Sequence, residues 1–216
     1  ALEKSHLFAE NERYFSRKKA SEKEAEKQAA FFNSLSPKWE EERHLPPERI
    51  KALLAPCHLQ KGERVLDIAC GNGLIDDELL SEGTEVVAID VSSAMIENAQ
   101  KRHSQEKISY FCRDFYSFDD EKKYDVLLVF DAYPHFADKD AFKAKAASLL
   151  KKGGRLYILH SAAKVKVNAH HQDEKTSMVS TALLSPKQEA FPYWSAFKKG
   201  AMADDESHYF LELIRR

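Results

Sequence analysis

The chain has 216 residues, enough for one sizeable hydrophobic core and a small appendage. Hydrophobic residues make up 43% and charged residues 31%, and 33 basic and 35 acidic side chains leave a formal charge of −2. This balance gives no general attraction to nucleic acid or to an anionic membrane, so we expect neither as a partner. The longest apolar run, Val126–Phe130 with its neighbours, is far too short to cross a bilayer.

Cysteine use and the first residues indicate a cytoplasmic protein. Cys57, Cys70 and Cys112 show no metal-knuckle or disulfide-framework spacing, which is typical of reduced thiols in a reducing compartment. Residues 1–13 are polar and lack the apolar core of a signal peptide. The sequence leaves open whether the protein is a monomer or a homodimer.

Composition changes near residue 50. Residues 1–50 contain no glycine and are dense in Lys and Glu, and we expect an N-terminal helical lid there, followed by one domain over residues 51–216. Ala25, Ala29 and Phe32 are spaced i, i+4, i+7, so one helix face can dock. Covering a bound ligand and simple docking of the helix are equally compatible with the apolar residues of this segment. These residues are Phe31, Phe32, Leu35 and Trp39.

From Gly62 onward, strand and helix patterns alternate. This alternation implies βαβ units with right-handed crossovers, and it predicts an α/β, Rossmann-like, doubly wound sheet that is mostly parallel, with helices on both faces. Strands are expected over residues 64–69, 85–90, 108–112, 124–130, 155–160 and 207–214, the last at or near an edge. Helices are expected over residues 47–55, 74–82, 94–103, 139–150 and 186–197.

A glycine turn and an acidic residue predict a nucleoside site. Residues 67–73 (DIACGNG) leave a strand and enter a helix, at the end of the sheet where doubly wound folds bind ligands. Gly71 and Gly73 allow the backbone to approach a ligand closely. Asp90 ends the next strand, where a carboxylate accepts hydrogen bonds from both ribose hydroxyls. The plainer interpretation is a tight turn followed by a helix cap.

Three further carboxylates help to distinguish between possible nucleoside ligands. Asp76 takes the place of the third glycine in the dinucleotide pattern G-x-G-x-x-G, and with Asp77 it would repel a pyrophosphate at the helix N-terminus. Asp67, at the strand end, suits a cationic ligand. S-adenosylmethionine carries a sulfonium and an amino group and no phosphate, so it fits better than NAD. An NAD-linked oxidoreductase and a non-catalytic module that binds S-adenosylmethionine are the competing interpretations.

Residues 64–160 resemble the class I S-adenosylmethionine-dependent methyltransferases, in particular the small-molecule branch that includes ubiquinone and menaquinone biosynthesis enzymes. Ala69 stands where this family commonly has glycine, and Asn72 where it has threonine or serine. The resemblance implies a seven-stranded sheet with an antiparallel strand near its C-terminal edge. The matching segments are residues 65–73 (VLDIACGNG), 86–92 (VVAIDVS) followed by Met95-Ile96, 112–115 (CRDF), 125–130 (DVLLVF) and 149–156 (LLKKGGRL).

The same resemblance implies contacts with S-adenosyl-L-methionine and transfer of its methyl group to a small-molecule acceptor. Asp90 would hold the ribose, Val91 and Met95 would flank the adenine, Asp114 would accept from the adenine amino group, and Phe115 would donate through its backbone. The expected cofactor-binding residues are Asp67, Ala69, Gly71, Gly73, Asp90, Val91, Met95, Asp114, Phe115 and Phe130.

Histidines gather in segments expected to border the acceptor. His135 follows the fourth strand and His160 ends the fifth, and either is a candidate catalytic base toward a hydroxyl, thiol or carbon acid. With His170 and His171 they allow a second interpretation, a metal or a metal-bearing substrate, although no zinc-site spacing is present and we assign no metal ligand. Each histidine by itself also fits a plain packing role.

The residues at the end of the fourth strand limit which kind of acceptor atom we expect. FDAY, residues 130–133, stands where enzymes that methylate amino groups carry an Asn-Pro-Pro-Tyr type signature. We therefore expect an oxygen, sulfur or carbon acceptor, or a metalloid. Asp131 and Tyr133 fit either a place beside the acceptor or a role in capping and packing. The aromatic residues of 193–197 are expected to pack against the domain.

Overall fold

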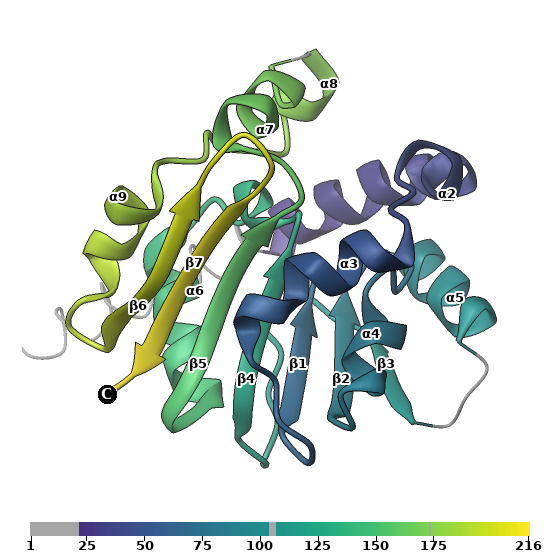
Figure 1. Ribbon diagram of the computed structural model, residues 1–216. Helices are drawn as coiled ribbons and strands as arrows, with labels where there is room; N and C mark the ends of the chain where they lie inside the picture. Colours follow the sequence, from purple (N-terminus) through teal and green to yellow (C-terminus); the bar gives the residue numbers. More distant parts are fainter. Residues whose placement is uncertain (1–21, 104–106, 173) are drawn as a thin grey trace, which may run out of the picture.

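The computed structural model describes residues 22–103, 107–172 and 174–216. Its centre is a seven-stranded sheet with the strand order β3-β2-β1-β4-β5-β7-β6 (Figure 1). β1 to β5 are parallel, and β7 pairs antiparallel with β5 on one side and β6 on the other. The strands are β1 (Arg64–Ile68), β2 (Glu85–Asp90), β3 (Ile108–Cys112), β4 (Tyr124–Phe130), β5 (Leu150–His160), β6 (Phe197–Asp204) and β7 (Tyr209–Arg215).

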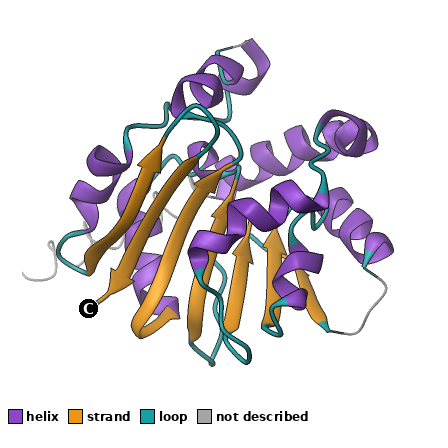
Figure 2. Cartoon of the chain, viewed as in Figure 1, coloured by secondary structure: helices purple, strands orange, loops and turns teal. Residues whose placement is uncertain are grey.

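Helices cover both faces of the sheet, and others lie across its upper end, as Figure 2 shows. A helix over residues 22–35 comes first, and none of the helices in the described ranges has the length and apolarity needed to cross a membrane. The others are α2 (Trp39–Glu42), α3 (Pro47–Leu54), α4 (Asp76–Ser81), α5 (Ser93–Arg102), α6 (Lys139–Leu149), α7 (Lys164–His170), α8 (Glu174–Ser177) and α9 (Pro186–Ala190). Short 3-10 turns are Ser36–Lys38, Ala55–Cys57, Tyr133–His135 and Phe191–Tyr193.

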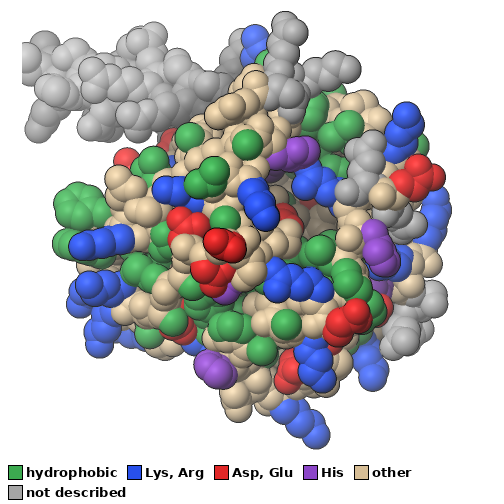
Figure 3. All heavy atoms as spheres, turned by 45° about the horizontal axis from the view of Figure 1, so that its top comes forward, with side chains coloured by type: hydrophobic (Ala, Val, Ile, Leu, Met, Phe, Trp, Pro, Cys, Tyr) green, Lys and Arg blue, Asp and Glu red, His purple; other side chains and the backbone are tan. Residues whose placement is uncertain are grey.

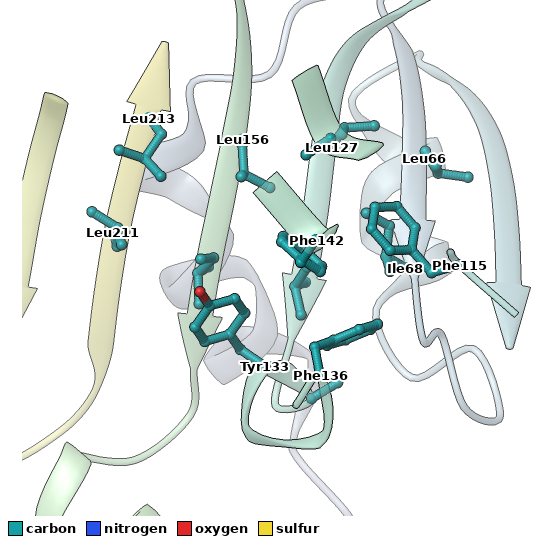
Figure 4. Close-up of a cluster of buried hydrophobic side chains, with 14 of the residues drawn as sticks. Leu66, Ile68, Phe115, Leu127, Tyr133, Phe136, Phe142, Leu156, Leu211 and Leu213 are labelled. Atoms are coloured by element: carbon teal, nitrogen blue, oxygen red, sulfur yellow. The ribbon is translucent and has the colours of Figure 1, made fainter. Parts of the chain in front are cut away.

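The central strands are apolar on both faces because helices bury both. In β4, Val126 and Leu128 join a cluster that includes α3 and α4, whereas Leu127 and Val129 join a cluster that includes α6. Figure 4 shows this second cluster, in which side chains of β1, β4, β5 and β7 lie in a row near Phe142 of α6. The predicted doubly wound α/β sheet is therefore confirmed.

The C-terminal third differs from the prediction. The helix expected to run from Pro186 to Phe197 ends at Ala190, before a 3-10 turn that contains Pro192, and Phe197 starts β6, a strand that was not predicted. Most residues of β6 are exposed or half-buried, and it carries Lys198 and Lys199. This is usual for an edge strand, which needs no hydrophobic alternation. The polar residues after His160 contain α7 and α8, also unpredicted.

Candidate active site

A cavity of about 570 Å³ lies at the carboxyl ends of the parallel strands. Its walls come from these strand ends, from the helix over residues 22–35, from α2 and from α7. Figure 3 turns this end of the molecule toward the viewer and shows a hollow bordered by Lys and Arg side chains. The volume is in the range that encloses a small-molecule ligand, about 300–1,000 Å³.

The turn after β1 forms one end of this cavity. Ala69, Gly71 and Gly73 all have positive φ angles, of 58°, 56° and 74°. Gly71 lines the cavity, whereas Gly73 of the same turn does not, and an added Cβ on Gly73 would stand 2.8 Å from Asp76 Oδ2 and 2.8 Å from His103 Nε2. The first glycine is therefore placed for contact with a ligand, and the second is needed for packing of the turn itself.

Asp90 ends β2 beside this turn. Its Oδ2 accepts a hydrogen bond from the backbone N–H of Gly71 at 2.9 Å, and its Oδ1 accepts one from the N–H of Ser92 at 2.8 Å. Burial raises the pKa of Asp90 to about 6, and these N–H donors limit the rise. A carboxylate oxygen can accept more than one hydrogen bond, so each oxygen can still accept one from a ribose hydroxyl.

Most of the predicted cofactor-binding residues share this cavity. Asp114, in the loop after β3, lines it near Phe115; burial raises the Asp114 pKa, while hydrogen bonds, including those of Ser117, act against the rise. Apolar walls beside Asp90 and Asp114 suit an adenine ring. The predicted residues on the lining are Ala69, Gly71, Asp90, Val91, Met95, Asp114, Phe115 and Phe130.

Asp67 and Gly73 do not line the cavity. Asp67 is 1% exposed, and neither of its carboxylate oxygens has a hydrogen-bond partner within the described ranges. Burial, reinforced by neighbouring Asp76, raises the Asp67 pKa well above its usual value. Tyr110 Oη donates to Asp76 Oδ2 at 2.7 Å. Neither Asp67 nor Asp76 lines the cavity. A role of Asp67 in binding a cationic ligand therefore stays a prediction, and Asp67 could affect such a ligand only indirectly, through the glycine turn.

The opposite end of the cavity carries the histidines. His135, His160, His170 and His171 all line it, although their segments are separated in the chain. His135 donates from Nδ1 to the Val179 carbonyl at 2.9 Å, and burial lowers its pKa to about 3. His160 is 1% exposed, and its Nδ1 lies 3.4 Å from Asp131 Oδ1.

The structure separates the roles of Asp131 and Tyr133. Asp131 lines the cavity. Tyr133 is fully buried, and its hydroxyl lies 2.9 Å from that of Tyr193, so its role is packing. In the part of the chain that the structure describes, no group of three or more His, Cys, Asp or Glu side chains is arranged to hold a metal ion.

Residues from the helical segments complete the walls. Phe31, Phe32, Leu35 and Trp39 line the cavity, and the part of the predicted lid over residues 1–21 lies outside the described residues. Gln28, Arg43 and Lys166 also line it, and sequence reasoning missed all three. No motif marks them, because they come from segments that only the tertiary fold brings to one cavity.

Comparison with known proteins identifies a methyltransferase domain. Residues 65–154 match the family model described as a methyltransferase domain. The ubiquinone biosynthesis O-methyltransferase of Coxiella burnetii is 30% identical over 115 residues, which are 52% of this chain and 49% of that protein. The enzyme of the same name from Pelagibacter ubique is 38% identical over 101 residues, 45% of this chain and 42% of that protein.

Solved structures share the fold. Magnesium protoporphyrin IX methyltransferase from Synechocystis PCC 6803, solved with bound SAH, superposes with a TM-score of 0.67 and 18% identity, covering 89% of this chain and 100% of that one. One chain of a complex containing the Haloferax volcanii Trm112 methyltransferase activator gives a TM-score of 0.73 and 19% identity, covering 85% and 97%. At this identity the likeness establishes the fold alone.

Residues 65–154 are therefore a methyltransferase domain of the S-adenosylmethionine-dependent class, as the sequence motifs predict, and S-adenosylmethionine is the cofactor of this class. The residues of the cavity fit that cofactor. Asp90 lines the cavity, where its carboxylate can accept hydrogen bonds from a ribose, and S-adenosylmethionine has no phosphate that would need a binding site. Acidic residues in the first turn of α4, Asp76, Asp77 and Glu78, would repel a pyrophosphate there. The chain spans about half the length of the curated relatives it matches.

Proposed function

We propose that this protein transfers the methyl group of S-adenosylmethionine to a small-molecule acceptor through oxygen, sulfur or carbon. The observation that carries this proposal is a single cavity with two chemically different ends. Asp90 and the glycine turn border one end, and His135 and His160 border the other. A methyl donor and an acceptor can therefore meet in one enclosed space, where positioning and exclusion of water promote a displacement reaction.

The residues of the first end would bind and orient the cofactor. Asp90 accepts from the ribose hydroxyls, Val91 and Met95 flank the adenine, and Asp114 and Phe115 pair with its edge. The bound sulfonium supplies an activated methyl carbon. The second end then needs only to orient the acceptor and, where the acceptor loses a proton, to take that proton.

We further propose that the helix over residues 22–35 acts as a lid over this cavity. Asn33 Oδ1 accepts from Ser92 Oγ at 2.7 Å and from the Ala94 N–H at 3.2 Å, which joins the helix to the start of α5. Gln28 Nε2 donates to the His135 carbonyl at 2.7 Å. The helix thus contacts both ends of the cavity, so its displacement would open both.

Calorimetry with S-adenosylhomocysteine tests the cofactor assignment. We expect Asp90→Ala to weaken binding by about 10²–10⁴-fold, because two hydrogen bonds to a charged group are lost. The matched control is Glu85→Ala, which removes an exposed acid from the other end of β2. Wild-type affinity should fall as the pH drops through about 6, where Asp90 takes up a proton, and Asp90→Asn should abolish this dependence.

The same measurements separate the competing functions. No heat with S-adenosylhomocysteine, together with binding of NADH, would favour an oxidoreductase and reject the proposal. Cofactor binding without transfer of labelled methyl to any compound in a metabolite extract would instead favour a non-catalytic module. A cytoplasmic location and a monomeric or homodimeric state stay predictions.

A further inference from the structure

Asp131 is held in an unusual and well-defined position at the end of β4. Its φ angle is 52°, a left-handed conformation that costs most residues energy and that, after glycine, Asn and Asp tolerate best. Ser161, the residue after β5, donates to it twice, from its N–H to Oδ1 at 2.8 Å and from its Oγ to Oδ2 at 2.6 Å. Two neighbouring strand ends are therefore joined through one carboxylate.

This carboxylate stays ionised although it is half-buried. Burial would raise the Asp131 pKa, but hydrogen bonding and charge from His160, with the hydrogen bonds from Ser161, outweigh it and hold the pKa below its usual value. Asp131 is thus a fixed negative charge on the cavity wall. Its Oδ1 faces Nδ1 of His160 at 3.4 Å, a separation that commonly shortens when a substrate binds.

The other ring nitrogen of His160 lacks a partner. Nε2 is buried and makes no hydrogen bond to any residue of the described ranges, although His160 lines the cavity. A carboxylate beside Nδ1 favours a proton on that nitrogen, which leaves a lone pair on Nε2. An unpaired buried acceptor costs free energy, so it points to a donor that arrives with the ligand.

His135 is less suited to accept a proton. Its Nδ1 donates to a neutral carbonyl, that of Val179, and burial lowers its pKa to about 3. His160 instead has a carboxylate partner to offset the positive charge that it gains with a proton. Of the two candidate bases, His160 has the environment that proton removal requires.

We propose that Asp131 is a positioning residue that holds His160 as the base for a hydroxyl acceptor. This inference rests on the proposed methyl transfer and narrows its acceptor from oxygen, sulfur or carbon to oxygen. In the step, the acceptor O–H bond breaks and its proton goes to Nε2 of His160, while the oxygen forms a bond to the methyl carbon. The carbon–sulfur bond breaks with its electron pair on sulfur, and the imidazolium later releases its proton to water.

The proton chemistry explains why a hydroxyl is favoured. A thiol, with a pKa of about 8.5, is already partly ionised near neutral pH, and a neutral amine attacks through its own lone pair. A phenol, with a pKa of about 10, is almost fully protonated and a poor nucleophile until a base removes its proton. A buried base held by a carboxylate is therefore most useful for a hydroxyl.

Nitrogen-15 NMR of the histidine rings tests the positioning role without any turnover. In the full chain with S-adenosylhomocysteine, the His160 signals, assigned by their loss in His160→Gln, should show a protonated Nδ1 and a bare Nε2. Asp131→Asn removes the negative charge beside Nδ1 while its amide oxygen can still accept from the Ser161 N–H, so we expect the fraction of the Nδ1-protonated tautomer to fall. Asn also tolerates the left-handed backbone and still accepts from Ser161.

The turn between β6 and β7 offers a matched control. There Asp205 Oδ1 lies 3.1 Å from Nδ1 of His208, so Asp205→Asn makes the same change in an exposed pair. It should alter only the His208 signals. A protonated Nε2 on wild-type His160, or an unchanged tautomer in Asp131→Asn, would overturn the positioning role.

Turnover of three matched acceptors tests the hydroxyl assignment. Phenol, thiophenol and aniline are supplied with methyl-labelled S-adenosylmethionine. We expect Asp131→Asn to slow phenol methylation by no more than about 10²–10⁴-fold, the usual contribution of the base itself, with little effect on thiophenol. Ser161→Ala, which leaves the carboxylate in place, should cause a smaller loss, and kcat should change far more than KM.

The outcomes distinguish this inference from the proposed function. If wild-type protein fails to bind S-adenosylhomocysteine, the methyltransferase proposal itself is rejected. If it binds the cofactor but methylates thiophenol or aniline and not phenol, or none of the three, the hydroxyl assignment is rejected. Equal losses for phenol and thiophenol in Asp131→Asn would also contradict it, because they would indicate a purely structural role.

Discussion

Single residues in the turn after β1 show how a departure from a motif is accommodated. Ala69 occupies a position where the class I methyltransferases that the sequence resembles commonly have glycine, and its φ angle is 58°. A side chain in this left-handed conformation costs about 1–2 kcal/mol, because its Cβ crowds the following carbonyl. The chain therefore keeps the turn geometry with alanine and accepts some backbone strain at the wall of the cavity.

Substitution of this alanine should not destabilise the protein. We expect Ala69→Gly to raise the free energy of unfolding by up to about 1 kcal/mol, since relief of strain exceeds the extra entropy of an unfolded glycine. Denaturant unfolding measures this, with Ala144→Gly as the control. Ala144 is exposed within α6, where the same change should cost about 1 kcal/mol. Equal losses in both variants would contradict the strain at Ala69.

At the scale of elements, the helix over residues 22–35 connects both ends of the cavity. Its contacts come from side chains that carry no motif, such as Asn33 to the start of α5 and Gln28 to the His135 carbonyl. On the far side of the cavity Arg43, just after α2, hydrogen-bonds His170 at the end of α7. Two helical segments that are distant in the chain are thereby linked across the site.

Loosening this helix should change how the cofactor is held. We expect Asn33→Ala to weaken S-adenosylhomocysteine binding by about fivefold, corresponding to roughly 1 kcal/mol for the lost hydrogen bonds, and to speed its dissociation. Stopped-flow fluorescence of Trp39 provides the rates. Ser34→Ala is the control, because Ser34 Oγ donates within its own helix, to the Phe31 carbonyl. Unchanged dissociation in Asn33→Ala would argue against a lid and for a passively docked helix.

For the whole molecule, the buried carboxyls near the glycine turn set a dependence of stability on pH. Burial raises the pKa of Asp67 well above its usual value of 3.8, so the folded protein retains a proton that the unfolded chain releases. A group with a raised folded-state pKa stabilises the fold at low pH, and that contribution is lost as the pH rises toward and through the folded pKa.

Thermal unfolding measures this contribution. Asp67→Asn cannot ionise, so we expect its Tm relative to the wild type to increase from pH 5 to pH 8 in the absence of cofactor. The control is Asp119→Asn, at an exposed carboxyl whose pKa the hydrogen bond and charge of Lys145 lower. Its Tm difference should be flat in this range, because both folded and unfolded forms are ionised there. A flat difference for Asp67→Asn would contradict a retained proton.

The sequence by itself determined the parallel core and predicted the end of the cavity at the glycine turn, where we propose that the cofactor binds. Strand periodicity, the glycine turn and Asp90 are encoded in short contiguous segments, so local physics specifies them and the domain match agrees. Edge strand β6 escaped prediction because an exposed edge does not require alternating hydrophobic residues. Likewise, nothing local showed that Asp67 and Gly73 do not line the cavity.

Only the tertiary structure decided the acceptor end. Gln28, Arg43 and Lys166 lie on separate elements, and no spacing in the chain relates them, whereas the histidines were expected there from their places after the fourth and fifth strands. The pairing of Asp131 with Ser161 and His160 likewise exists because β4 and β5 are neighbours in the sheet and end at the same level. Contacts between distant segments depend on how the whole chain packs, and that packing alone placed a carboxylate beside the buried imidazole.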